Sequence, residues 1–331
     1  PQLRMPAKKA KPKKGGADDA EGATQDHFVV NYQKACKALN VTADPELIRD
    51  VRDEERETPY IHVVLGDRDI GPAGVRTIVE ALLCRPVGGQ RMVGGGPYDK
   101  ITAIRLWRCN ASDDGAVAVA DLLTARKPDS EDFSMRVVCV DLLGNNIGPR
   151  GCDALGRALA ANVPTLLTLS LAYNPHIADE GTVLLCEGLR DNRVLKNLDL
   201  KFCAVGEDGA GALATVFATP TSAICNVDLR GNRIGSRGFA KLCMGLRRNT
   251  VLTKLDLQDT CIGGYPPTDE DLSCIKSGVD SLLCNNTLAH LDLLNNGMGM
   301  RAVPFLEPLV APERKSLTFF AVDASLPTEV L

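Results

Sequence analysis

Five aspartates with similar sequence surroundings are the residues best placed for shared chemistry, because each lies between two branched apolar residues. They are Asp141, Asp199, Asp228, Asp256 and Asp292. If these tripeptides are strands, four of the carboxylates would stand about 5 Å apart on successive strands. Such a row could bind a basic peptide, a basic helix or a Lys/Arg-rich tail by charge complementarity. Lys201 and Arg230, two residues beyond their aspartates, are expected to neutralise part of this negative charge.

The other side chains capable of catalysis are not brought together by any sequence pattern. The four histidines are His27, His62, His176 and His290. Only His62 and His290 are expected on the same face as the aspartates, at its opposite ends. No Ser-His-Asp or Cys-His group can be assembled, and carboxylates on a solvated sheet lack the burial that tunes acid–base catalysts. The sequence therefore predicts a protein without enzymatic activity, metal, cofactor or small-molecule substrate.

The chain has 12 cysteines but no Cys-x-x-Cys pair that would indicate a zinc site or a redox motif. Cys109 and Cys203 occupy one position of a repeated phrase, and Cys186, Cys243 and Cys284 are expected on buried helix faces. Buried free thiols behave as small hydrophobic groups and are typical of a reducing compartment. The net charge is −4, and the sequence shows neither a signal peptide nor a membrane-spanning apolar run. We therefore expect a cytoplasmic protein that does not bind membranes.

The elements that position these residues follow from one phrase, Leu-x-x-Leu-x-Leu-x-x-[Asn/Cys]-x-[Leu/Ile/Val]. Two copies begin 29 residues apart (195 and 224), and each leads into an amphipathic helical stretch, at residues 209–217 and 238–246. The phrase predicts strands beginning near Tyr60, Ile101, Val137, Leu166, Leu195, Ile224, Leu252 and Leu288, with a degraded ninth copy at Leu317. One strand and one helix per unit is typical of a leucine-rich-repeat solenoid, whose working surface is the face lined by the strands.

The period of 28 or 29 residues, with Ile-Gly-x-x-Gly at 147–151 and 234–238, resembles the ribonuclease-inhibitor type of leucine-rich repeat. The resemblance covers about residues 58–331. It implies a right-handed α/β horseshoe with a parallel sheet on the concave face and helices outside. Neighbouring helices are about 10 Å apart and neighbouring strands about 4.8 Å, which explains the curvature. Leu-Asp-Leu is common in this repeat type, so the aspartates can also be a repeat feature that binds nothing.

The chain is expected to divide into three segments. Residues 1–24 form a disordered basic arm, residues 25–57 an N-terminal helical cap, and residues 58–331 a repeat domain of about eight repeats with a C-terminal half-repeat cap. The cap includes a helix that starts at Asp44-Pro45. The arm is either a solvated tail or an electrostatic arm for an acidic surface, such as an import receptor, nucleic acid or tubulin tails. It carries Lys8, Lys9, Lys11, Lys13 and Lys14.

Aromatic residues and insertions are further candidate contact sites. Trp107, Tyr173 and Phe202 are expected near strand exits on neighbouring repeats. Trp107 either is exposed as an interface anchor or packs under the neighbouring loop. Two repeats are lengthened after their helices, by residues 86–97 and 127–133. The glycine-rich run in the first insertion lacks the residues of a nucleotide-binding loop, so we expect partner contacts or ornaments.

A second resemblance narrows the function. Residues 31–41, followed by Ile48-Arg49 and by residues 70–74, are similar to the start of small leucine-rich-repeat proteins associated with cilia, flagella and testis. This implies a non-catalytic interaction scaffold of the ciliary or flagellar axoneme, with tubulin or axonemal complex subunits as partners. One alternative is a regulator of a small GTPase, similar to the Ran GTPase-activating proteins, although their acidic tail has no counterpart in residues 316–326. The other is a nucleic-acid-associated or mitochondrial ribosomal component, although nucleic acid is not the expected partner.

Overall fold

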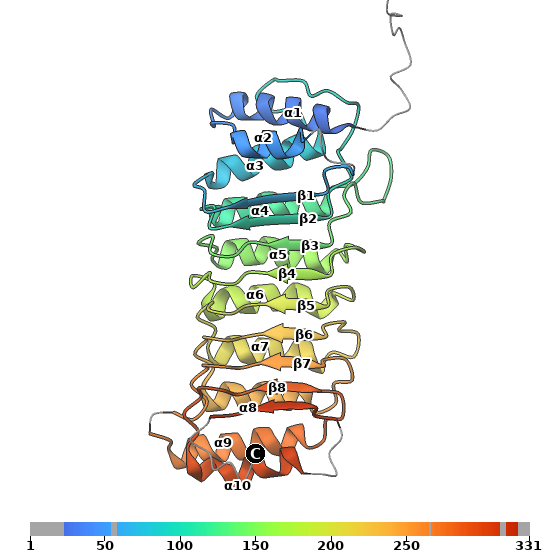
Figure 1. The fold of residues 1–331 in the computed structure, drawn as a ribbon. Helices are drawn as coiled ribbons and strands as arrows, with labels where there is room; N and C mark the ends of the chain where they lie inside the picture. Colours follow the sequence, from blue (N-terminus) through green and yellow to red (C-terminus); the bar gives the residue numbers. More distant parts are fainter. Residues whose placement is uncertain (1–22, 54–57, 265, 312–315, 324–331) are drawn as a thin grey trace, which may run out of the picture.

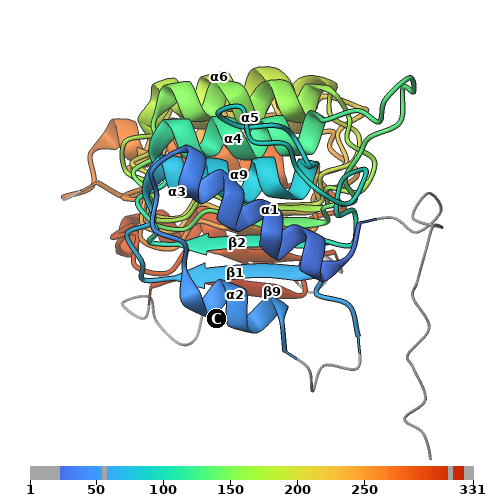
Figure 2. The same ribbon diagram turned by 90° about the horizontal axis from the view of Figure 1, so that it is seen from above.

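The computed structural model describes residues 23–53, 58–264, 266–311 and 316–323, and the five lysines of the basic arm lie outside these ranges. Within these ranges, nine strands form one parallel sheet in which each strand pairs with the next one along the chain. The strands are stacked from the N-terminal end to the C-terminal end, and the helices that connect them gather on one face of the sheet (Figures 1 and 2).

The elements alternate as the repeat predicts. The strands are β1 (His62–Gly66), β2 (Ala103–Trp107), β3 (Cys139–Asp141), β4 (Thr168–Ser170), β5 (Asn197–Asp199), β6 (Asn226–Asp228), β7 (Lys254–Asp256), β8 (His290–Asp292) and β9 (Phe319–Ala321). The helices are α1 (Gln25–Ala38), α2 (Pro45–Val51), α3 (Gly71–Leu83), α4 (Ser112–Thr124), α5 (Pro149–Ala160), α6 (Ala178–Asp191), α7 (Glu207–Ala218), α8 (Gly235–Leu246), α9 (Asp269–Leu282) and α10 (Val303–Leu306), with 3-10 turns η1 (Met300–Ala302) and η2 (Glu307–Val310). Viewed down the stack, α5 and α6 lie farther out than α3 and α9, so the sheet lines the concave side (Figure 2). The predicted leucine-rich-repeat architecture is confirmed.

The leucines of the repeated phrase form the core. Leu198, Val227 and Leu255 occupy the same register position in adjacent strands and are at most 2% exposed. Because side chains alternate along a strand, the residues on either side of this layer point to the concave side. The first leucine of each phrase, such as Leu195, is buried but lies before the strand. Each strand therefore begins two residues after the first residue of the phrase.

Asparagine and cysteine side chains join successive repeats below the leucine layer. The Asn232 amide donates to the carbonyls of Leu200 (2.8 Å) and Leu229 (2.7 Å), and its oxygen accepts from the Cys203 and Val205 amides (3.0 and 2.9 Å). Cys203 occupies the same position one repeat earlier, where its thiol donates to a backbone carbonyl of the previous repeat. Each such side chain satisfies backbone groups that the turn would otherwise leave buried without partners.

The second N-terminal helix begins as the sequence predicts. The Asp44 side chain accepts from the amides of Glu46 (2.9 Å) and Leu47 (2.8 Å), and Pro45 occupies the first turn of α2. The Asp44 carboxylate also accepts from Arg68 at 2.6 Å, and Arg68 stands at the position used by asparagine or cysteine in later repeats. The first repeat thus uses an ion pair to contact α2. The division of the chain into arm, cap and repeat domain stays a prediction.

The insertion at residues 86–97 contacts α1 within the chain. The Asn31 side chain is 1% exposed, donates to the Val93 carbonyl at 2.9 Å and accepts from the Val93 amide at 2.8 Å. Lys34 donates to the Arg91 carbonyl at 2.8 Å. The inner residues of this insertion therefore fasten the first helix to the first repeat, a role that the sequence reading did not assign to them.

The cysteines are free thiols, and all except Cys261 and Cys284 are buried or partly buried. Cys109 and Cys203 are buried in the turn position, and Cys186 and Cys243 are buried on helix faces, as predicted. Burial raises the pKa of Cys109 to about 11 and that of Cys186 to about 12. The prediction for Cys284 is wrong, because this residue is exposed. It lies two residues beyond the end of α9, so it has left the helix face that packs on the core.

Candidate protein-binding surface

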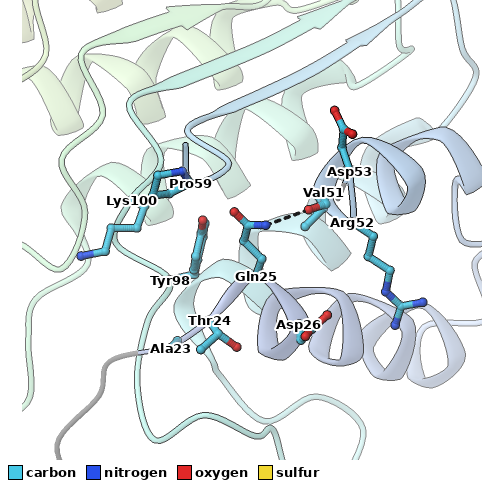
Figure 3. A pocket seen from close by; sticks show the side chains of 10 residues that line it. All are labelled: Ala23, Thr24, Gln25, Asp26, Val51, Arg52, Asp53, Pro59, Tyr98 and Lys100. Carbon is cyan, nitrogen blue, oxygen red and sulfur yellow. Dashed lines mark hydrogen bonds between the residues drawn. The ribbon is translucent and has the colours of Figure 1, made fainter. Parts of the chain in front are cut away.

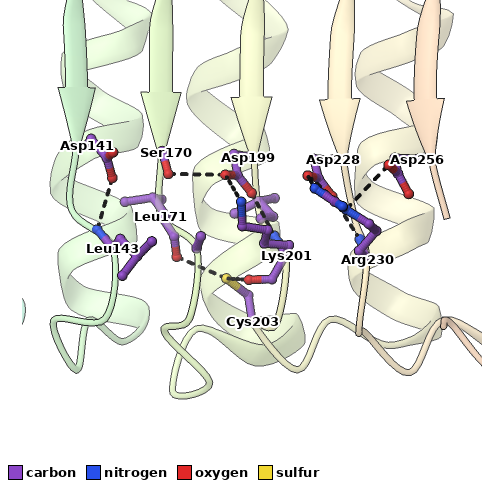
Figure 4. Close-up of polar contacts among 12 residues, drawn as sticks. Asp141, Leu143, Ser170, Leu171, Asp199, Lys201, Cys203, Asp228, Arg230 and Asp256 are labelled. Atoms are coloured by element: carbon purple, nitrogen blue, oxygen red, sulfur yellow. Dashed lines mark hydrogen bonds and ion pairs between the residues drawn. The ribbon is translucent and has the colours of Figure 1, made fainter. Parts of the chain in front are cut away.

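One column of residues runs along the middle of the concave face. The structure places in this column Val64, Arg105, Asp141, Ser170, Asp199, Asp228, Asp256 and Asp292, each in register with the next. Figure 4 shows the aspartates of neighbouring strands side by side, pointing away from the helices. The aspartates therefore lie in one row across the strands, and that this row binds a partner stays a prediction.

Each aspartate of the row also ends its own strand. The Asp199 carboxylate accepts from the amide of Lys201, two residues on, at 3.1 Å. The same bond recurs at Asp141 (3.2 Å), Asp228 (3.1 Å), Asp256 (3.2 Å) and Asp292 (3.0 Å). A side chain that accepts from the amide two residues ahead mimics a turn and stops strand pairing. The Leu-Asp-Leu phrase therefore has a structural function in every one of these repeats.

The charge of the row is balanced in part by two basic side chains. Lys201 lies 3.2 Å from the Asp199 carboxylate. Arg230 lies 2.7 Å from Asp228 and 3.3 Å from Asp256, so one guanidinium joins two strands (Figure 4). Burial raises the pKa of the Asp256 carboxyl group above its ordinary value, and the nearby Asp228 acts in the same direction. The surface is thus a network of both signs rather than a plain acidic stripe.

The C-terminal end of the row is less neutralised. Within the described ranges, Asp292 has no cation within salt-bridge distance. His290, on the same strand, stacks on the Phe319 ring with centroids 4.0 Å apart. Burial lowers the pKa of His290, and the positive charge of Lys254 lowers it further. His290 is therefore less readily protonated than an exposed histidine, although Asp292 acts in the opposite direction.

The aromatic residues do not form the single cluster that the sequence suggested. Trp107 is half-buried at the exit of β2, where its indole N–H donates to the Asp141 carboxylate at 2.7 Å. Tyr173 and Phe202 stack on each other with ring centroids 4.7 Å apart. The prediction that all three lie on neighbouring repeats is wrong, because the β3 repeat separates Trp107 from Tyr173. Trp107 is part of the concave network, and the other two residues form a separate pair.

Carboxylates that the sequence reading missed join the starts of successive helices. The Asp179 side chain accepts from the amides of Gly206 (2.7 Å) and Gly209 (2.8 Å), which belong to the next repeat. A Cβ atom at residue 209 would stand 2.8 Å from that carboxylate. Asp113 makes the same pair of bonds to the glycines of Ile147-Gly-x-x-Gly. At Gly151 and Gly209 the absence of a side chain therefore allows the close approach of an acidic side chain from the preceding repeat, a signal visible only when repeats are aligned.

A polar hollow near α1 offers no catalytic arrangement. Gln25 crosses it and donates to the Val51 carbonyl at 3.0 Å (Figure 3). The side-chain oxygen of Gln25 accepts from the Tyr60 amide at 2.7 Å. Its charged lining residues are Asp26, Arg52, Asp53 and Lys100. No histidine or cysteine is among the residues that line it.

The groups needed for a metal site or a reactive thiol are likewise dispersed. His62 and His290 lie on β1 and β8, far apart in the strand order, as predicted. In the described part of the chain, no group of three His, Cys, Asp or Glu side chains could hold a metal ion. No described helix is both long and apolar enough to cross a bilayer.

The chain is similar over its repeats to several known proteins. The family described as Leucine Rich repeat matches residues 164–186, 191–214 and 248–264. Mouse NACHT, LRR and PYD domains-containing protein 12 is 36% identical over 269 residues, which cover 74% of this chain and 23% of that protein. Mouse ribonuclease inhibitor is 34% identical over 170 residues, covering 50% of this chain and 35% of the inhibitor.

The pig ribonuclease inhibitor is similar to the same degree, with 33% identity over 178 residues, covering 53% of this chain and 37% of the inhibitor. This chain therefore spans less than two fifths of each of these relatives. The solved structure of leiomodin-1 actin-binding site 2 has a TM-score of 0.36 and 21% identity, over 41% of this chain and 75% of that one. That likeness is too low to bear on the fold.

Proposed function

Since this chain is a leucine-rich-repeat protein of the ribonuclease-inhibitor type, we propose that it is a non-catalytic scaffold that binds other proteins. The observation that carries this proposal is the concave face from β4 to β8, where charges of both signs are fixed on a rigid sheet. Fixed charges of both signs select a partner with the complementary pattern and speed its association. The proposed contact residues are Trp107, Asp141, Asp199, Lys201, Arg230, Asp228, Asp256 and Asp292.

Paired charge-removing variants test the concave face. Asp199→Asn with Asp292→Asn keeps the oxygen that ends each strand but removes two charges from the face. Glu180→Gln with Asp208→Asn removes two charges from exposed positions on α6 and α7 and serves as the control. A partner isolated from the source cells at low salt should bind the concave variant at least about 10-fold more weakly, a loss of about 1.4 kcal/mol. Equal binding of both variants, or loss only in the control, would contradict the proposal.

The finer proposal is that the assembly is a ciliary or flagellar axoneme. It is supported by the resemblance of residues 31–41 to the start of small cilium-associated repeat proteins. Several of the residues that carry this resemblance, including Asn31, Tyr32 and Cys36, are at most 2% exposed. They therefore pack α1 against the first repeat. The resemblance thus indicates a shared packing of buried residues, and it is weaker support for a shared binding surface.

The basic arm gives the axonemal proposal its own test. The full chain and a variant lacking residues 1–16 would be co-sedimented with microtubules at stepped salt concentrations. If the arm binds the acidic tubulin tails, deletion lowers the bound fraction at low salt and the difference disappears at high salt. Microtubules from which the tails have been cleaved serve as the control. Binding that is indifferent to the arm and to salt would remove tubulin from the proposed partners.

A further inference from the structure

In eight repeats, the turn that follows the strand has a residue in the left-handed backbone region at the same position, four residues after the buried centre of the strand. These residues are Asp67, Arg108, Gly144, Tyr173, Phe202, Gly231, Asp259 and Asn295, with φ between 50° and 67°. We call them the strand-exit column. Glycine adopts this conformation freely, and asparagine and aspartate adopt it more readily than other residues. The column therefore has a clear preference for glycine or a short polar side chain.

Tyr173 and Phe202 break this preference, and so does Arg108, whose exposed side chain forms an ion pair with Asp67. A bulky residue in the left-handed region is strained by on the order of 1–3 kcal/mol. The core does not require either ring, because Tyr173 is 48% exposed and Phe202 is 40% exposed. The neighbouring positions of the column, Gly144 and Gly231, show that the turn closes without a side chain. Strain that burial does not compensate indicates a use at the surface.

The two rings are held in one defined arrangement. Their centroids are 4.7 Å apart and their planes differ by 18°, so the rings stack. The Phe202 ring also lies over Gly231, where a Cβ atom would stand 2.2 Å from it. Pro175 and Ala204, two residues further along the same two turns, are exposed as well. We call these four residues the aromatic ledge (Tyr173, Pro175, Phe202 and Ala204).

Within the described ranges, one unpaired basic side chain lies near the ledge. The turns at residues 172–177, 201–206 and 230–234 contain no aspartate or glutamate. A shallow hollow next to Phe202 is lined by Lys201, Arg230 and Asp259, and the two cations are already paired with aspartates of the concave row. Arg233 is exposed and, in the described part of the chain, has no carboxylate within salt-bridge distance.

We propose that the aromatic ledge is an anchor for a partner peptide segment in which an aliphatic or aromatic side chain is flanked by a carboxylate. The apolar side chain packs on the stacked rings and fills the hollow beside Phe202. The carboxylate faces Arg233. Rigid aromatic residues that are already ordered before binding lose little entropy when a partner covers them, which is why such residues dominate interface energies. This inference rests on the proposed function as a protein-binding scaffold and adds a second surface to it.

The test uses a library of random 12-residue peptides displayed on phage, selected on the full chain. The selected peptides should be enriched in an apolar residue next to aspartate or glutamate. The variant Tyr173→Asn with Phe202→Asn keeps residues that tolerate the left-handed turn, so it should fold with unchanged or higher thermal stability. A synthetic selected peptide should bind this variant at least about 30-fold more weakly, as expected for loss of an interface hot spot.

The variant Asp199→Asn with Asp292→Asn separates the ledge from the concave face. Peptides that lose affinity in this concave variant but not in the ledge variant would overturn the ledge proposal and leave the proposed function standing. Selected sequences rich in lysine and arginine, or equal binding to the ledge variant, would overturn it too. Failure of the library to yield any specific peptide would count against both proposals.

Discussion

Replacing Asp179 with alanine should lower the free energy of unfolding by about 2–4 kcal/mol. The side chain accepts two backbone hydrogen bonds at the start of α7, from Gly206 at 2.7 Å and Gly209 at 2.8 Å. A hydrogen bond to a charged group contributes about 1.5–3 kcal/mol. The Gly209 amide is buried and would be left without this acceptor, whereas the less buried Gly206 amide can reach water, so the expected sum lies below the simple total.

Urea unfolding followed by circular dichroism and by the fluorescence of Trp107, the single tryptophan, measures this loss. Asp179→Asn retains an acceptor without the charge and should lose roughly half as much. Asp208→Ala is the control, because that side chain is 82% exposed and its nearest cation, Lys241, is 3.8 Å away. The reasoning would be refuted if Asp179→Ala fell within about 0.5 kcal/mol of the control, the usual range for surface substitutions.

Three further perturbations probe other parts of the structure. Asn31→Ala should lower the free energy of unfolding by about 2–3 kcal/mol and speed hydrogen exchange in residues 86–97, because it removes both hydrogen bonds between Asn31 and Val93. Exchange as slow as in the wild type would contradict this role. The pKa of the Asp256 carboxyl group is raised, so its protonated form stabilises the fold at acidic pH and this contribution is lost as pH rises through the raised pKa. Asp256→Asn should therefore gain stability relative to the wild type as the pH is raised from 4 to 7. A urea midpoint of the variant that falls relative to the wild type over this range would contradict the prediction. Cys261 and Cys284 are exposed, so a thiol reagent should modify them before Cys186, and an early modification of Cys186 would contradict its burial.

The sheet and its register were predictable because they follow from apolar spacing. A leucine every second or third residue, repeated at about 29, leaves one way to bury Leu198, Val227 and Leu255 in a common layer. The same spacing fixed which residues face the concave side. It did not reveal that each aspartate also ends its strand, because that bond depends on the turn geometry two residues ahead.

The remaining contacts could not be predicted from the spacing of the apolar residues. Trp107 is the last residue of β2 and Phe202 lies in the turn after β5, one position further along the repeat. This offset places the Trp107 indole on Asp141 and the Phe202 ring on Tyr173. The bonds between Asn31 and Val93 join residues that are 62 apart in the chain, and nothing local in the sequence indicates them. The strand-exit column could have been found by aligning the repeats, because Gly144 and Gly231 mark a left-handed position that Tyr173 and Phe202 share with them.

Hydrogen exchange of the chain with and without its purified partner tests the central claim most directly, namely that the strand side of the solenoid is the binding surface. Binding should slow exchange in the strands and strand-exit turns from β4 to β8 and leave the outer faces of α5–α8 unchanged. Slower exchange confined to those helices, with the sheet side unaffected, would contradict the account.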